Sequence, residues 1–203
     1  MDEGNDPVLS TRHRILVAAA TMLGEDAAAR LSVRAVAARA GVSAGSLRYH
    51  FPTQRDLRDA VLAGIYGLVA SDDAIHDRSV PPRDRLVACL RQVLAPVGAG
   101  QEARAAFGKV YEGFIAPEPD EHVRAAYLGM EREGRRRTEY WLSVLVDEGV
   151  LAAGDDERRA RFLMTVLNGL SMERALPAED SLPQTETDAL YLAVDAVLDP
   201  RSA

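Results

Sequence analysis

The residues best suited to contact another molecule lie between Leu31 and Phe51, which read LSVRAVAARAGVSAGSLRYHF. Their hydrophobic spacing predicts two short helices. Gly41 predicts the turn between them, because glycine readily takes the left-handed conformation after a helix. Such a pair is a helix-turn-helix, which presents its second helix to the major groove of DNA. We expect Val42 to pack into the core and Leu47 to anchor the second helix from its inner side.

The opposite side of that second helix is expected to contact the duplex. Small residues at its start let the backbone approach the groove floor, while Tyr49 and His50 near its end can donate hydrogen bonds to phosphates. The structural alternative is that the two helices pack in an unrelated bundle and that Tyr49 and His50 only cover a helix end. The predicted DNA-binding residues are Arg34, Ser43, Ala44, Gly45, Ser46, Arg48, Tyr49, His50, Gln54 and Arg55.

The charge distribution favours contact with nucleic acid. The chain as a whole carries a net charge of -7, but residues 10–58 hold eight arginines and three acidic residues, a net charge of +5. Residues 59–203 hold 16 basic and 25 acidic residues, a net charge of -9. A basic segment joined to an acidic one is typical of a nucleic-acid-binding module attached to a second unit.

Helical periodicity extends through the sequence and no alternating run predicts a strand, so the predicted fold class is all-α, with about nine helices. Apolar stripes and capping residues place the expected helices at 11–23, 33–40, 43–50, 53–73, 82–97, 102–115, 120–148, 156–176 and 183–198. The first three form a head, residues 10–57, with its motif at 32–51. The fourth joins this head to a body, residues 58–203.

Composition excludes several other classes of protein. The single cysteine, Cys89, excludes an intramolecular disulfide and a zinc site built from several thiolates. The four histidines lack metal-ligand spacing, and there is no nucleophile motif or phosphate-binding glycine loop, so we expect no catalytic residue, metal or cofactor. The acidic N-terminus and the lack of an apolar run of about 20 residues predict a cytoplasmic protein without a membrane span.

The helix-turn-helix, followed by Tyr49-His50-Phe51 and, after a short gap, Leu57, resembles the DNA-binding region of the TetR family of bacterial transcriptional regulators. The resemblance covers residues 11–65 and is strongest in 32–57. The body resembles the family in size and in the number and order of its helices.

This resemblance implies a repressor that binds palindromic operator DNA as a homodimer and is released by a small-molecule effector. The dimer would form through the last two long helices, 156–176 and 183–198. Two positions depart from the family pattern. Gln54 stands where the family often has a lysine that touches a phosphate, and Gly45 stands where it often has threonine. Arg55 could replace the first of these contacts.

Larger side chains in the body are candidates for an effector pocket, since such pockets are mostly apolar with a few polar groups. Aromatic residues and methionines at helical spacing also form ordinary core, which is the alternative. The candidate residues are Phe107, Tyr111, Phe114, Tyr127, Met130, Trp141, Phe162 and Asn168.

Two other functions fit the same residues. A helical small-molecule-binding or scaffold protein with a non-functional DNA-binding head agrees with the acidic body and with Gln54, and it would show no salt-dependent association with any duplex. An activator that works through a protein partner would bind DNA equally well, but expression of its target would fall when its gene is deleted.

Overall fold

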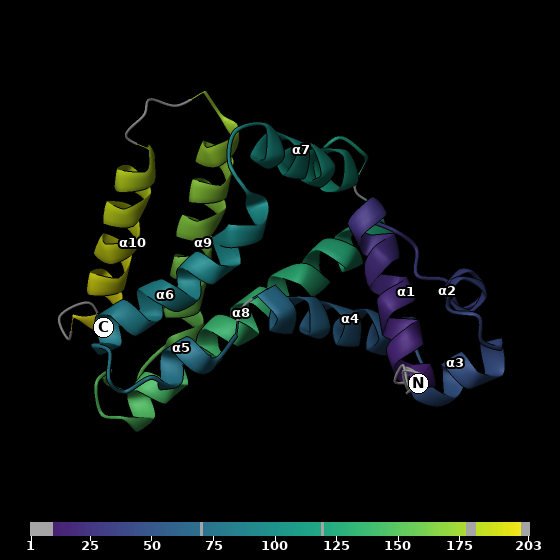
Figure 1. Ribbon diagram of the computed structural model, residues 1–203, viewed down its shortest axis with the longest axis horizontal. Helices are drawn as coiled ribbons and strands as arrows, with labels where there is room; N and C mark the ends of the chain where they lie inside the picture. The colour runs from purple at the N-terminus through teal and green to yellow at the C-terminus, as the bar shows by residue number, and fades with distance from the viewer. Residues whose placement is uncertain (1–9, 70, 119, 178–181, 200–203) are drawn as a thin grey trace, which may run out of the picture.

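The computed structural model describes residues 10–69, 71–118, 120–177 and 182–199. Within these ranges the chain folds into ten α-helices, nine of them at least seven residues long, and no residue lies in a β-strand. The all-α fold class is therefore confirmed. Figure 1 shows the head helices α1–α3 at one end of the molecule and α9 and α10 at the other, with α4 and α8 extending between them.

The head contains three helices and the start of a fourth, and it has its own apolar core. The helices are α1 (Thr11–Glu25), α2 (Val33–Ala40), α3 (Ala44–His50) and α4 (Gln54–Val69). Ile15, Val36, Leu47, Phe51 and Leu57 are all buried where these helices meet. The four helices begin within one residue of the positions that the sequence predicts, because each is preceded by a serine or threonine whose oxygen caps it.

The body contains the remaining helices around a second apolar core. They are α5 (Asp73–His76), α6 (Pro82–Leu94), a 3-10 turn η1 (Ala95–Val97), α7 (Gln101–Val110), a π-helical turn η2 (Tyr111–Ile115), α8 (Glu121–Asp147), α9 (Asp156–Ala175) and α10 (Leu182–Leu198). Leu90, Trp141, Leu163 and Val194 lie fully buried in this core. The core is therefore shared among α6, α8, α9 and α10.

Three helix predictions differ from the structure, and one of them is the expected helix 82–97, since α6 ends at Leu94 and a 3-10 turn follows. The fourth helix was expected to reach residue 73 but ends at Val69, and α5 follows as a separate short helix. The side chain of Ser71 accepts a hydrogen bond from the amide of Asp73 at 3.1 Å, so a local side-chain turn begins the new helix. The expected helix 102–115 also changes at Tyr111, where the backbone widens into the π turn.

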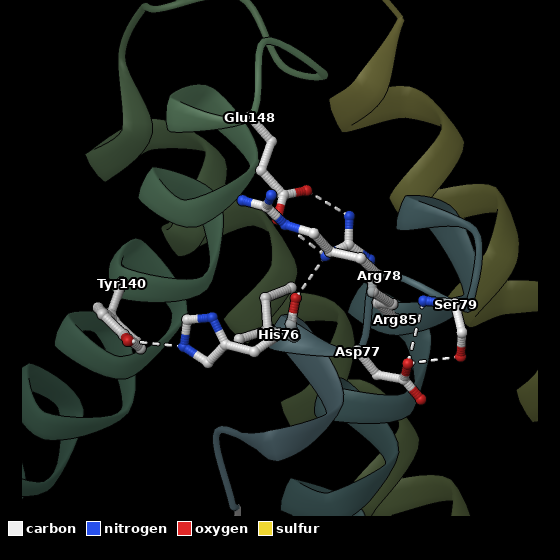
Figure 2. Close-up of polar contacts among 8 residues, drawn as sticks. His76, Asp77, Arg78, Ser79, Arg85, Tyr140 and Glu148 are labelled. Atoms are coloured by element: carbon white, nitrogen blue, oxygen red, sulfur yellow. Dashed lines mark hydrogen bonds and ion pairs between the residues drawn. The ribbon is translucent and has the colours of Figure 1, made fainter.

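A buried ion pair joins α5 and α6 to the end of α8 (Figure 2). The side chain of Arg85 is only 3% exposed, and it donates to the carbonyl oxygen of Ile75 at 2.6 Å and to both carboxylate oxygens of Glu148. The exposed Arg78 donates to the same carboxylate at 3.1 Å. His76 of α5 also contacts the hydroxyl of Tyr140 on α8 at 2.9 Å. These contacts fix the corner of the body that lies farthest from the head.

We expect the stability of this corner to depend on pH. The hydrogen bond from Arg85 holds the pKa of Glu148 below its ordinary value of 4.5. The folded state therefore favours the charged carboxylate, and this contribution is full above pH 4.5 and is lost as the pH falls through the lower folded pKa. Glu148→Gln should lower the melting temperature at neutral pH, and the difference in melting temperature between this variant and the native chain should disappear in acid. Thermal unfolding followed by circular dichroism measures both.

Glu112→Gln is the matched control, because Glu112 is exposed on η2. This variant should melt with the native chain at every pH. A gap for Glu148→Gln that stays constant from neutral pH into acid would contradict the role given to the Arg85–Glu148 pair.

Candidate nucleic-acid interface

Local hydrogen bonds set the angle between α2 and α3. Gly41 ends α2 with φ 64° and ψ 39°, a left-handed conformation that a residue with a side chain rarely takes. The amide of Val42 donates back to the carbonyl oxygen of Ala37 at 3.0 Å, which closes the turn. Ser43 then caps α3 by accepting from the amide of Ser46 at 3.0 Å. The helix-turn-helix geometry is therefore determined by the residues of the motif itself.

The recognition helix α3 has one buried side and one open side. Leu47 is 1% exposed and packs into the head core, as the sequence predicts. Tyr49 is 84% exposed, and its ring meets that of His50 edge to face with centroids 5.2 Å apart. Ser43, Ala44, Gly45 and Arg48 are exposed, while Ser46 and His50 are half-buried. The predicted base-reading and phosphate-contacting side chains of α3 therefore share the open side with Tyr49.

The arginines of the head differ in how far they are available to phosphates. Arg39 is held by the carboxylate of Glu25 through two hydrogen bonds, one of them 2.6 Å long. Arg55 lies 3.6 Å from Asp59, a contact between exposed groups that contributes little. Arg34 and Arg48 are exposed and, among the described residues, have no ion-pair partner. These two arginines therefore present unneutralised positive charge beside the open side of α3.

Gln54 has a second role that the sequence does not reveal. Its side-chain amide donates to the carbonyl oxygen of Leu31 at 3.0 Å, so in the absence of DNA it fastens the chain just before α2. A capping box lies beside it, since Thr53 and Asp56 each accept from the amide of the other at 3.0 Å. The start of α4 is thus rigid, and it is bonded to the segment that carries the motif.

The segment Asp26–Leu31, here called the head loop, links α1 to the motif. Arg58 of α4 donates to the carbonyl oxygen of Ala29 at 2.7 Å, and Nε2 of His122 on α8 donates to that of Ala28 at 2.6 Å. Because a carbonyl oxygen only accepts, Nε2 of His122 carries the proton. The head loop is therefore bonded to two different helices of the body.

Further contacts join the body to the same region. Lys109 of α7 donates to the carbonyl oxygen of Gly24 at 2.9 Å, and Arg30 lies 3.4 Å from the carboxylate of Asp120. A side chain added at Gly113 of η2 would meet the backbone of the head loop at 3.6 Å, so the π turn lies directly against it. Sequence reasoning missed all of these contacts, since they join main-chain atoms to residues some 80 to 90 positions away.

A mainly apolar cavity of about 490 Å³, here called the junction cavity, lies where α1, α4, η1 and α8 meet. Its size is typical of sites for small ligands. One charged residue, Arg58, belongs to its wall. The lining residues are Ala20, Leu23, Gly24, Ala27, Arg58, Leu62, Ile65, Val93, Pro96, Ala126 and Met130. A ligand in this cavity would touch the end of α1 as well as the helices of the body.

The eight residues predicted to form an effector pocket lie in different environments. Met130 lines the junction cavity, whereas Trp141 is fully buried in the body core and donates from Nε1 to Asp72 at 3.0 Å. The rings of Phe114 and Tyr127 pack edge to face with centroids 5.7 Å apart. Phe162 lines a separate cavity of about 390 Å³ between α9 and α10. The others are Phe107, half-buried, and Tyr111 and Asn168, both exposed.

Other chemistry finds little support in the described part of the chain. No group of three or more histidine, cysteine or acidic residues there could hold a metal ion. Cys89 is buried, and desolvation raises the pKa of its thiol to about 12, so the thiol remains protonated at neutral pH. No helix among these residues has the length and apolar character needed to cross a membrane.

The fold and this interface define a helix-turn-helix DNA-binding protein. Residues 15–61 match the family described as bacterial regulatory proteins, tetR family. Residues 15–61 are therefore similar to the DNA-binding region of TetR-family regulators. No curated protein sequence matches the chain.

Solved structures show the same fold over nearly the whole chain. GusR of Salmonella enterica is 20% identical with a TM-score of 0.54, and the match covers 97% of this chain and 99% of that one. A structure from Pseudomonas aeruginosa PAO1 is 23% identical with a TM-score of 0.55, covering 100% and 98%. The repressor QsdR of R. erythropolis, a TetR-family protein, is 19% identical with a TM-score of 0.50, covering 91% and 94%.

The open side of α3 makes a prediction for Tyr49. Tyr49→Phe should weaken binding to every duplex alike, by about tenfold, because it removes one hydrogen bond to a charged phosphate. Ser46→Ala, in contrast, should lower affinity for the preferred duplex more than for random DNA, because the sequence predicts that Ser46 contacts base edges. Fluorescence anisotropy with a duplex selected from a random library, and with a random control, measures both.

Tyr111→Phe removes a hydroxyl from the body and is the matched control, with no expected change in DNA affinity. If Ser46→Ala weakened binding to preferred and random DNA equally, or if Tyr49→Phe weakened binding to the preferred duplex alone, the roles assigned to these two residues would be wrong.

Proposed function

We propose that the chain is a ligand-responsive repressor that binds palindromic operator DNA as a homodimer and is released by a small-molecule effector. The observation that carries this proposal is the cavity at the junction of head and body, because a ligand there touches α1 and the body helices together. One protein with this fold, QsdR, is described as a transcriptional repressor. Such a regulator works in the cytoplasm, where its operator lies.

The exposed apolar side chains of α9 and α10 support a dimer. Phe162 and Met172 of α9 and Leu176, which follows its last residue, are each exposed by between 44% and 50%, and Leu192 of α10 is 72% exposed. These helices lie at the end of the molecule away from the head (Figure 1). A second copy of the chain would bury the same face on both partners in a two-fold symmetric interface.

Dimerisation through α9 and α10 would place two recognition helices on one DNA molecule. Two such helices enter successive major grooves when they lie about 34 Å apart, one turn of the duplex. Effector binding releases the operator if it favours a dimer in which this separation is wrong. By thermodynamic linkage the effector then binds the DNA-free dimer more tightly than the DNA-bound one, by about 1 to 3 kcal/mol. Operator affinity that is unchanged at saturating effector would contradict this mechanism.

The dimer can be tested with a charge placed on the exposed face of α9. Met172→Glu should convert a two-chain species into single chains at micromolar concentration, because each interface would bury two uncompensated carboxylates. Leu128→Glu is the matched control, since it puts the same charge on an exposed apolar residue of α8 outside that face. Analytical ultracentrifugation gives the mass. A native chain that is monomeric at every concentration would show that this face does not form the dimer.

DNA binding itself can be tested by anisotropy titration against the DNA that flanks the chain's own gene and against a random duplex. We expect tight, sequence-dependent binding that weakens steeply with salt, since phosphate contacts release counterions. The control is the variant with Arg34 and Arg48 both changed to Met, which should bind both duplexes more weakly and with a smaller salt dependence. Failure to prefer any duplex selected from a random library over random DNA would favour a ligand-binding or scaffold protein with a silent head.

A further inference from the structure

We propose that the effector is a compact apolar molecule carrying one carboxylate, and that Arg58 both binds this carboxylate and transmits its arrival to the head loop. This inference rests on the proposed function, in which a small molecule releases the DNA. It adds the chemical class of the ligand and the residue that detects it.

The wall of the junction cavity selects for an apolar ligand with a single anionic group. Leu23, Leu62, Ile65, Val93 and Met130 are among its apolar lining residues, and Arg58 is the one charged residue among the described residues that line it. An apolar body gains free energy by leaving water for such a surface. A carboxylate is accommodated only where a cation meets it, which places that end of the ligand at Arg58.

Arg58 has unused capacity to bind an anion. Its guanidinium has five N–H donors, and one of its nitrogens donates to the carbonyl oxygen of Ala29. Among the described residues it forms no ion pair, and burial lowers its pKa because the charged form is poorly solvated there. A carboxylate could accept two parallel hydrogen bonds from this guanidinium, and it brings a full negative charge that the carbonyl oxygen of Ala29 lacks.

The hydrogen bond from Arg58 to Ala29 explains how a bound ligand would affect the DNA-binding residues. Ala29 lies in the head loop, three residues before Ser32, whose side chain caps α2. If the ligand draws Arg58 away from the carbonyl oxygen of Ala29, the head loop loses one of the bonds that join it to the body. The ligand-bound state therefore holds α2 and α3 less firmly than the free state does.

Arg58 also lines a second, more polar cavity of about 420 Å³, together with Asp59, Glu121 and Arg132. A carboxylate there would meet two acidic residues beside several basic ones, and a larger share of the wall is polar than in the junction cavity. The junction cavity is therefore the site that fits an apolar monocarboxylate.

The test uses pairs of probes that differ only in the charged group: benzoate, 2-naphthoate, octanoate and decanoate against the corresponding primary alcohols. Binding to the full chain is measured by calorimetry and by the rise in melting temperature. We expect at least one acid to bind about tenfold more tightly than its alcohol, the difference that one charge-assisted contact provides. Arg58→Met should abolish this preference, and Arg58→Lys should retain part of it.

Arg104→Met is the matched control, because it removes an exposed arginine of α7 that does not line the cavity. Hydrogen exchange on the native chain adds a second readout, in which the bound acid should speed exchange in α2 and α3. The proposal is overturned if no acid of the panel binds, if acids and alcohols bind equally, or if Arg58→Met keeps the preference.

Operator binding separates this inference from the proposed function. If an alcohol binds the cavity and releases DNA as well as its acid does, the chain is a ligand-responsive repressor but Arg58 does not detect a carboxylate. If an acid binds through Arg58 but operator affinity stays the same, the ligand class is correct and effector release is wrong.

Discussion

The structure depends most on the hydrogen bonds that the body makes to main-chain carbonyls at the end of α1 and in the head loop. The head has its own small core, but its orientation is set where Lys109, Arg58 and His122 of the body donate to carbonyl oxygens of residues 24–29, next to the bond that Gln54 of the head itself donates to Leu31. A buried or half-buried carbonyl that loses its partner costs about 1 to 3 kcal/mol. The three bonds from the body, of which those to Ala28 and Ala29 are half-buried, can therefore favour one arrangement of head and body and still be rearranged by a ligand.

Helix α8 connects this contact with the far end of the molecule. At 27 residues it is about 40 Å long, and its first turn holds His122 against the head loop. Beyond its last residue, Glu148 pairs with the buried Arg85 of α6. Because a long helix held at both ends is rigid, a displacement at one end also moves the other. Helices α8 and α4 are therefore suited to connect a dimer face on α9 and α10 with the recognition helix.

The sequence predicts the head well because its signals are local. Ser32, Gly41 and Ser43 each form hydrogen bonds with residues within five positions, so the bounds of α2 and α3 follow directly from the sequence. Leu47 is the apolar residue that predicts the buried side of α3. A serine turn at Ser71 is equally local, but the helical pattern around it concealed the end of α4.

The contacts between head and body could not be predicted in this way. In these contacts the side chains of Lys109 and His122 donate hydrogen bonds to main-chain oxygens. No residue type in the head loop predicts such a bond, because every residue has a main-chain oxygen. The same limit applies to the cavity. Large residues such as Trp141 are conspicuous in the sequence, but the cavity forms where Ala20, Ala27 and Ala126 leave space between helices. Small residues at a helix junction are therefore a better signal for a cavity than a set of aromatic residues.

Hydrogen–deuterium exchange on the DNA-free chain tests the central claim most directly. The comparison is between the native chain and the double variant Lys109→Met with His122→Phe, which removes two of the four donors to the carbonyls but leaves the head core intact. The account predicts faster exchange throughout residues 24–50 in the variant, with exchange in α9 and α10 unchanged. Exchange in residues 24–50 that is the same in both proteins would show that these hydrogen bonds do not control the head.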